Sequence, residues 1–148
     1  MPHQANNSRP RESLPSAARE ELLRSRKITS RNTGLTLTLA LNYGGRRDIL
    51  DGVIKAARLL KQGKLTPKKL NESAFSGLLE TAGLPDSDLV IRTSGELRLS
   101  NFLLWQTAYA EVFFTSELWP DLRKPQFIEA LKHFARRERR FGDIAPQR

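Results

Sequence analysis

The spacing of apolar residues predicts three short strands. Residues 35–43 (LTLTLALNY) alternate leucine with threonine and then become apolar, which is the period-2 pattern of a strand. Residues 89–92 (LVIR) and 112–115 (VFFT) are short runs rich in β-branched and aromatic residues. The run at 89–92 is expected to be buried and to lead into a turn formed by Thr93-Ser94-Gly95.

Helical periodicity is expected around and between these strands. The clearest case is residues 48–62, where apolar side chains recur at spacings of three and four and Gly63 follows the last turn. Shorter or weaker helical patterns begin or lie at residues 14–27, Thr66-Pro67, 73–81, 101–109 and Pro125. The helix at 101–109 is apolar nearly all round and is expected to be buried, with Trp105 in the core.

In the last helix, beginning at Pro125, His133 is expected to face solvent, and an apolar stripe on another face is expected to be buried. That stripe consists of Phe127, Ile128, Leu131, Phe134 and Ala135. His3 falls in the N-terminal tail, and neither histidine has a plausible partner for a triad or a metal site. Both are therefore assigned no role.

Composition indicates one globular domain. The 148 residues are 39% apolar and 28% charged, and residues 1–13 are polar enough to be expected disordered. The chain has no cysteine, which excludes disulfides, thiolate metal sites and a cysteine nucleophile and fits a reducing compartment. No signal peptide or membrane-spanning run is visible, so a cytoplasmic protein is expected.

A net charge of +9 is compatible with nucleic acid, an anionic membrane surface or an anionic substrate. One basic cluster lies in residues 1–31 and another at residues 136–140 (RRERR). Neither is interleaved with aromatic residues, and no helix-turn-helix, zinc-finger or RNA-recognition signature is present. A nucleic-acid partner is therefore disfavoured.

Candidate chemistry is concentrated just after the strand at 89–92. Arg92 stands where the strand ends, and the carboxyl ends of strands are where open α/β sheets bind ligands. Arg98 and Ser100 follow, and Ser100 is a suitable N-cap for the helix expected from Asn101. Two arginines, a hydroxyl and a helix N-terminus on one loop suit a phosphate or diphosphate.

A structural alternative explains the same residues. Arg92 could pair with Asp88 or Glu96, Arg98 could be a solvated loop residue, and Ser100 could be only a cap. Upstream, Gly44-Gly45 before Arg46 allows either a phosphate site or a tight turn with Arg46 packed across it, and the turn is favoured.

Four sequence blocks resemble the cis-prenyltransferases, the family of undecaprenyl diphosphate synthase. They are NTGLTLTLALNYGGRRDI at 32–49, LVIRTSGELRLSNFLLWQTAYAEVFFT at 89–115, LWPDL at 118–122 and RERRFG at 137–142. They occur in the family's order without a large gap. On this resemblance, residues 1–31 form a basic N-terminal segment, disordered and then helical. Residues 32–148 form the C-terminal half of a cis-prenyltransferase domain, an α/β fold with a partial parallel sheet flanked by helices.

The resemblance also implies an activity and a site. Members of the family extend an allylic diphosphate, commonly farnesyl diphosphate, with isopentenyl diphosphate, and they work with Mg²⁺ and as dimers. By motif, the isopentenyl diphosphate would be bound by Arg92, Arg98, Leu99 and Ser100. Glu111 would help to bind Mg²⁺, a cation that takes one or two carboxylates plus substrate phosphates. Arg46, Arg140 and Gly142 are weaker candidates, and Leu97 stands where some members have histidine.

One departure from the family is large. The Asp-Gly-Asn-Gly-Arg loop that binds the allylic diphosphate, and with it the catalytic aspartate, is absent from these 148 residues. The polypeptide alone is therefore expected to bind isopentenyl diphosphate weakly, if at all, and not to turn over. A truncated gene model, a broken gene or a chain that needs a complementary partner would each explain this absence. The polypeptide would act as half of an enzyme, as a homodimer or with a complementing subunit, or it would be a non-catalytic subunit of a complete partner. Membrane contact would be at most peripheral, through the lipid product.

Overall fold

The computed structural model describes residues 14–137. The chain divides into two compact units, of which the first ends at Tyr43 and the second begins at Gly44. Within the described range, no helix is both long and apolar enough to cross a lipid bilayer. The disorder expected for residues 1–13 lies outside the described residues.

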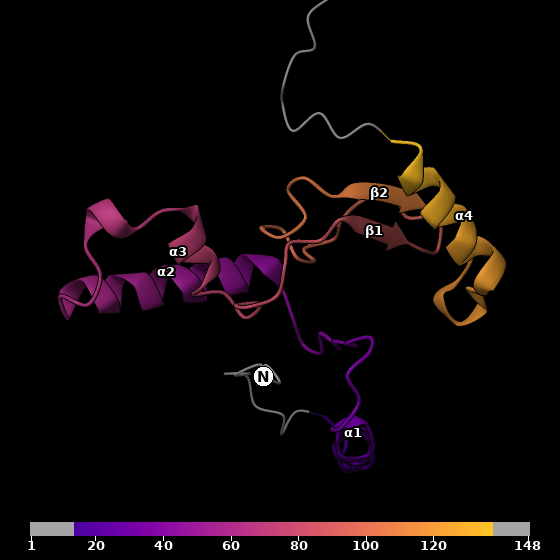
Figure 1. Cartoon of the computed structure of the whole chain (residues 1–148), viewed down its shortest axis with the longest axis horizontal. Helices are drawn as coiled ribbons and strands as arrows, with labels where there is room; N and C mark the ends of the chain where they lie inside the picture. Colours follow the sequence, from indigo (N-terminus) through magenta and orange to yellow (C-terminus); the bar gives the residue numbers. More distant parts are fainter. Residues whose placement is uncertain (1–13, 138–148) are drawn as a thin grey trace, which may run out of the picture. The chain divides into compact units, whose positions relative to one another are not determined.

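The first unit contains α1 (Ser16–Thr29), as the helical pattern at 14–27 predicted. The strand predicted at 35–43 is wrong, because these residues form no strand (Figure 1). The leucines that would have formed its apolar face are exposed, Leu35 at 97%, Leu37 at 78% and Leu39 at 54%. A strand is completed by hydrogen bonds to a neighbour, and both described strands pair only with each other. The alternation of leucine and threonine indicated a strand with one apolar and one polar face, but it carries no information about whether a neighbouring strand is present.

The second unit begins with α2 (Gly45–Lys61), which starts three residues before the predicted Asp48. One face of α2 carries the buried residues Asp48, Gly52 and Ala56. This face packs on α3 (Glu72–Ser76) and the turns after it, which replace the helix predicted at 73–81. The helical segment expected to begin at Thr66-Pro67 is a single 3-10 turn, η2 (Pro67–Lys69).

The two strands of the sheet are those predicted from the central and third apolar runs. β1 (Leu89–Arg92) and β2 (Glu111–Phe114) are parallel, with Leu89 opposite Glu111 and Arg92 opposite Phe114. The second strand begins one residue before the predicted Val112. The α/β class is therefore confirmed for a small, two-stranded sheet.

The helix predicted at 101–109 is absent, and this is the largest correction in the second unit. The segment is a series of turns in which Ser100, Asn101 and Leu103 have positive φ, at +49°, +62° and +46°. Left-handed residues cannot start a right-handed helix. Trp105 is half-buried against Phe75, with ring centroids 4.8 Å apart.

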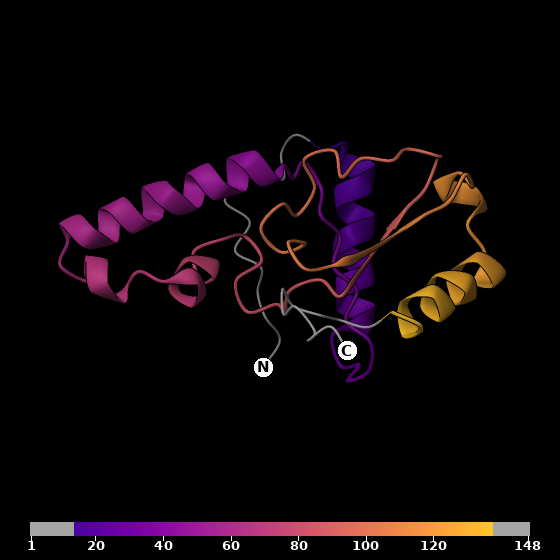
Figure 2. The same cartoon turned by 90° about the horizontal axis from the view of Figure 1, so that it is seen from above.

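The last helix, α4 (Lys124–Ala135), follows the 3-10 helix η3 (Trp119–Asp121) and lies beside β2 (Figures 1 and 2). Its fully buried residue is Ala130, whereas Phe127, Leu131 and Ile128 of the predicted stripe remain 45%, 40% and 37% exposed. His133 was expected to face solvent, but it is half-buried, with its ring 5.5 Å from that of Phe113. The predicted apolar stripe of this helix is therefore only partly covered in the described structure.

Candidate diphosphate-binding site

The turn that follows β1 is held firmly at the carboxyl end of the sheet. Ser94 and Gly95 both have left-handed backbones, with φ of +70° and +67°. Their amides donate hydrogen bonds to the carbonyl oxygens of Glu117 and Thr115, at 2.7 and 2.9 Å. The segments after β1 and β2 are thus tied together where an α/β sheet offers a ligand site.

Arg92, the last residue of β1, reaches toward the loop. Its Nη2 lies 3.5 Å from the Ser100 Oγ, which is at the outer limit of a hydrogen bond. Its Nε is buried and has no hydrogen-bond partner in the described part of the chain. Buried polar groups are normally paired, so this guanidinium keeps donor capacity that an anionic oxygen would take up.

Arg98 is oriented differently. Its Nε lies 2.7 Å from the Glu96 carboxylate, and 74% of its side chain is exposed. Glu96, one of the two carboxylates considered for Arg92, therefore pairs with Arg98 instead. Such an exposed pair contributes roughly 0–1 kcal/mol and can exchange for a stronger anion. Of the neighbouring leucines, Leu99 is half-buried and Leu97 is exposed.

Ser100 is not a helix N-cap, because no helix follows it in this part of the structure. The anion site predicted from the free amides of that helix is therefore wrong. What remains of the prediction is the hydroxyl group, which the positive φ of Ser100 presents to Arg92.

The glycine pair before α2 contacts the same loop. The Gly45 amide donates to the Asn101 carbonyl oxygen at 2.7 Å, and the Arg46 amide donates to Asn101 Oδ1 at 2.8 Å. The backbone of the glycine turn is thus engaged by protein, which agrees with the favoured turn interpretation. The Arg46 side chain, however, is exposed. Sequence reasoning missed Asn101, whose only signal was an asparagine directly after a serine cap candidate.

Glu111 lies at the opposite end of the strands from Arg92. In the parallel register the two residues are three positions apart, or about 10 Å along the strand direction. The Glu111 carboxylate lies 3.5 Å from Arg137 Nε, and residues 14–137 contain no cluster of three or more metal-ligating side chains. The structure therefore does not bring Glu111 to the Arg92–Ser100 pair.

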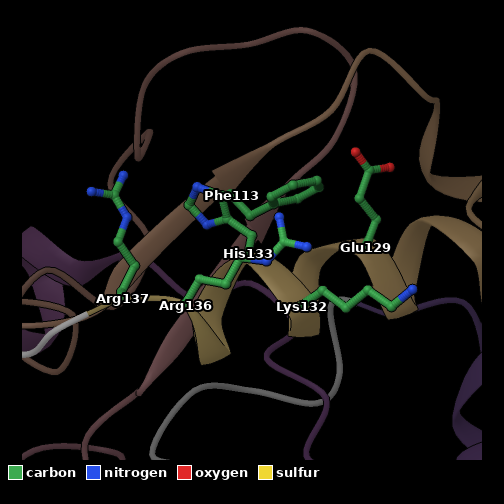
Figure 3. A pocket seen from close by; sticks show the side chains of 6 residues that line it. All are labelled: Phe113, Glu129, Lys132, His133, Arg136 and Arg137. Atoms are coloured by element: carbon green, nitrogen blue, oxygen red, sulfur yellow. The ribbon is translucent and has the colours of Figure 1, made fainter.

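A cavity of about 460 Å³ lies between β2 and α4 (Figure 3). It is lined by Phe113, Glu129, Lys132, His133, Arg136 and Arg137. None of the candidate residues of the loop after β1 lines it, although Arg137 is the partner of Glu111. The weaker candidates Arg140 and Gly142 lie outside the described residues.

Residues 7–142 match the family described as putative undecaprenyl diphosphate synthase. The chain belongs to this family. The match begins well before Asn32, so the expectation that the resemblance starts there is corrected: α1 is part of the family region.

Curated relatives include isoprenyl transferases. One, of Chlorobaculum tepidum, is 45% identical over 136 residues, which are 92% of this chain and 51% of that protein. Another is a ditrans,polycis-undecaprenyl-diphosphate synthase ((2E,6E)-farnesyl-diphosphate specific) of Escherichia coli K12, 50% identical over 131 residues, 88% of this chain and 52% of that protein. The chain is homologous to these enzymes and spans about half their length.

Solved structures agree. Lavandulyl diphosphate synthase from Lavandula x intermedia, in complex with dimethylallyl diphosphate, matches with a TM-score of 0.81 and 35% identity, over 90% of this chain and 58% of that one. A probable undecaprenyl diphosphate synthase from Campylobacter jejuni matches with a TM-score of 0.69 and 36% identity, over 89% and 59%. The fold is therefore that of part of an undecaprenyl diphosphate synthase.

Proposed function

We propose that this chain supplies the isopentenyl-diphosphate-binding, C-terminal half of a cis-prenyltransferase, which condenses isopentenyl diphosphate with an allylic diphosphate. The observation that carries the proposal is the pairing of Arg92 with Ser100 at the carboxyl end of β1, with a buried guanidinium donor still unpaired. The name of the Escherichia coli relative favours farnesyl diphosphate as the allylic substrate.

In this proposal Arg92 and Ser100 bind the diphosphate of isopentenyl diphosphate, and Leu99 lies between Ser100 and Arg98. Arg98 leaves Glu96 to bind the same group. Holding the diphosphate fixes the position of the attacking double bond, an orientation effect that lowers the barrier of a two-substrate reaction. Charge-assisted hydrogen bonds to a diphosphate contribute about 1.5–3 kcal/mol each.

Magnesium fits the described residues poorly. Glu111 offers one carboxylate, but it is engaged by Arg137 and lies about 10 Å along the strands from Arg92. When bound, Mg²⁺ supplies charge stabilisation at diphosphate oxygens. The assignment of Glu111 to the metal stays a prediction.

The proposal is tested on the 148-residue polypeptide by titration with isopentenyl diphosphate. Weak binding is expected, and Arg92→Ala and Arg98→Ala should each weaken it by roughly 1.5–3 kcal/mol because each removes a charge-assisted contact. Arg58→Ala, which removes an exposed arginine near the far end of α2, is the matched control and should leave affinity unchanged. Equal affinity in all three variants would remove both arginines from the site.

Turnover is the second test. The polypeptide alone, given farnesyl diphosphate, isopentenyl diphosphate and Mg²⁺, is expected to form no product. Addition of the N-terminal half of the Escherichia coli relative should restore it. Product from the polypeptide alone would contradict the half-enzyme proposal.

A non-catalytic subunit that associates with a complete partner is the second candidate. The exposed leucines at 35, 37 and 39 and the exposed apolar residues of α4 favour it, because such groups usually mark contact surfaces. Stoichiometric co-purification with a full-length cis-prenyltransferase, without a rise in the activity of that enzyme, would support the non-catalytic subunit over the half-enzyme. We also propose that the chain forms a homodimer, that it is located in the cytoplasm and that it has no nucleic-acid partner.

A further inference from the structure

Asn101 joins two segments that are far apart in the sequence. It follows Arg46 by 55 positions in the chain, yet it accepts two hydrogen bonds from the first turn of α2. Its carbonyl oxygen accepts from the Gly45 amide at 2.7 Å, and its Oδ1 accepts from the Arg46 amide at 2.8 Å. The N-cap residue of α2 is Gly44, which has no side chain to satisfy these amides. Asn101 therefore caps α2 from outside the helix.

The backbone conformation of Asn101 also favours asparagine at this position. Its φ of +62° lies in the left-handed region, where asparagine is enriched among residues other than glycine. Ser100, directly before it, has φ of +49° and presents its Oγ 3.5 Å from Arg92 Nη2. Ser100 is bonded directly to Asn101, so the contact of Asn101 with α2 also sets where the Ser100 backbone lies.

The start of α2 also lies close to the loop at Leu104. A Cβ added to Gly45 would lie 2.8 Å from Leu104 Cγ and 3.0 Å from the Leu104 backbone nitrogen. At the far end of the loop, the Gln106 side-chain amide lies 3.4 Å from Asp48 Oδ2, again on α2. The first turn of α2 thus lies against the loop at Asn101, Leu104 and Gln106.

We propose that Asn101 is a positioning residue: by docking the loop on the N-terminus of α2, it sets the Ser100 hydroxyl against Arg92 for diphosphate binding. This role rests on the proposed function of Arg92 and Ser100. It gives the Gly44-Gly45 pair a purpose other than phosphate binding, because only residues without side chains let the loop approach the helix so closely.

The test uses the 148-residue polypeptide and inorganic diphosphate as the probe, with affinity measured by NMR titration. Asn101→Gly keeps the left-handed backbone but removes the side-chain acceptor. Gly45→Ala alters no loop residue but forces the Leu104 backbone away from α2. Each should weaken diphosphate binding about fivefold, the equivalent of one lost hydrogen bond.

Gly52→Ala is the matched control on the same helix. Its added Cβ would lie 2.9 Å from Leu79 Cδ2 and 3.2 Å from Phe75 Cζ, so its nearest contacts are with α3 and the turn after it rather than with Asn101 or Leu104. It should lower the melting temperature and leave diphosphate affinity unchanged. Asn101→Asp keeps the acceptor oxygen and should preserve the hydrogen-exchange protection of the Arg46 amide that Asn101→Gly loses.

The outcomes separate the two proposals. If Arg92→Ala loses affinity while Asn101→Gly and Gly45→Ala bind like the unaltered chain, the positioning role is wrong and the proposed function stands. If Gly52→Ala weakens binding as much as Gly45→Ala, the effect is general destabilisation and the positioning role is again wrong. If the unaltered chain binds no diphosphate, both proposals fail together.

Discussion

The leucine-rich segment at 35–43 and the loop at 93–107 invite comparison. The first has the clearer pattern, yet it forms no strand and its leucines are exposed. The second has no regular structure either, yet Gln106 and Thr107 are buried and its backbone is held by α2 and by the segment after β2. Order therefore depends on the contacts available to a segment, more than on the regularity of its pattern.

The largest effect is expected in the packed part of the second unit. Leu79 is 3% exposed and contacts the face of α2 at Gly52. Leu79→Ala should lower the free energy of unfolding by about 2–5 kcal/mol, because it removes buried methyl groups and leaves a cavity. Urea denaturation measures the change. A loss below about 1 kcal/mol would mean that this packing is not maintained in solution.

A somewhat smaller effect is expected at Asp48, which is 1% exposed. Its Oδ1 accepts from the Glu80 amide at 2.8 Å, and Oδ2 lies 3.4 Å from Gln106 Nε2. Asp48→Ala should cost about 1–3 kcal/mol, because it leaves a buried backbone donor unpaired. The control is Asp51→Ala, which removes a helix-surface pair with Arg47 and should cost under about 1 kcal/mol. Equal losses of unfolding free energy in the two variants would show that the buried contacts of Asp48 contribute nothing to stability.

The smallest effect is expected in the exposed segment. Leu37, 78% exposed, makes so few contacts that Leu37→Ala should change the free energy of unfolding by at most about 0.5 kcal/mol in the isolated polypeptide. The same denaturation assay applies. If a complementary half of the family domain is bound, the variant should weaken that association, because the leucine would then be covered. A large loss in the isolated polypeptide would show that the segment is already packed there.

Local patterns were good predictors wherever neighbours in sequence supplied the contacts. The helical repeat placed α1, α2 and α4 to within a few residues, and the apolar runs placed β1 and β2 to within one. In each helix, hydrogen bonds form within the element, so its periodicity carries most of the information. The candidate site was predicted in the same way, because Arg92 is the last residue of the apolar run that forms β1.

The errors have one physical origin. The apolar run after Ser100 predicted a helix, but the Asn101 carbonyl and side chain bind the α2 amides, and the backbone turns left-handed to do so. His133 was placed in solvent from its position in the α4 repeat, and a contact with Phe113 buries half of it. Both contacts join residues 20 or more positions apart, which no local repeat encodes.

By itself, the sequence determined the family, the main helices, the two paired strands and the arginine at the end of β1. Only the tertiary structure decided that Arg98 pairs with Glu96, that Glu111 lies at the other end of the strands, and that Asn101 docks the loop on α2. Helices and apolar runs follow from interactions within a few residues. The geometry of a binding loop follows from which distant backbone groups take up its hydrogen bonds, and that is settled only when the chain folds.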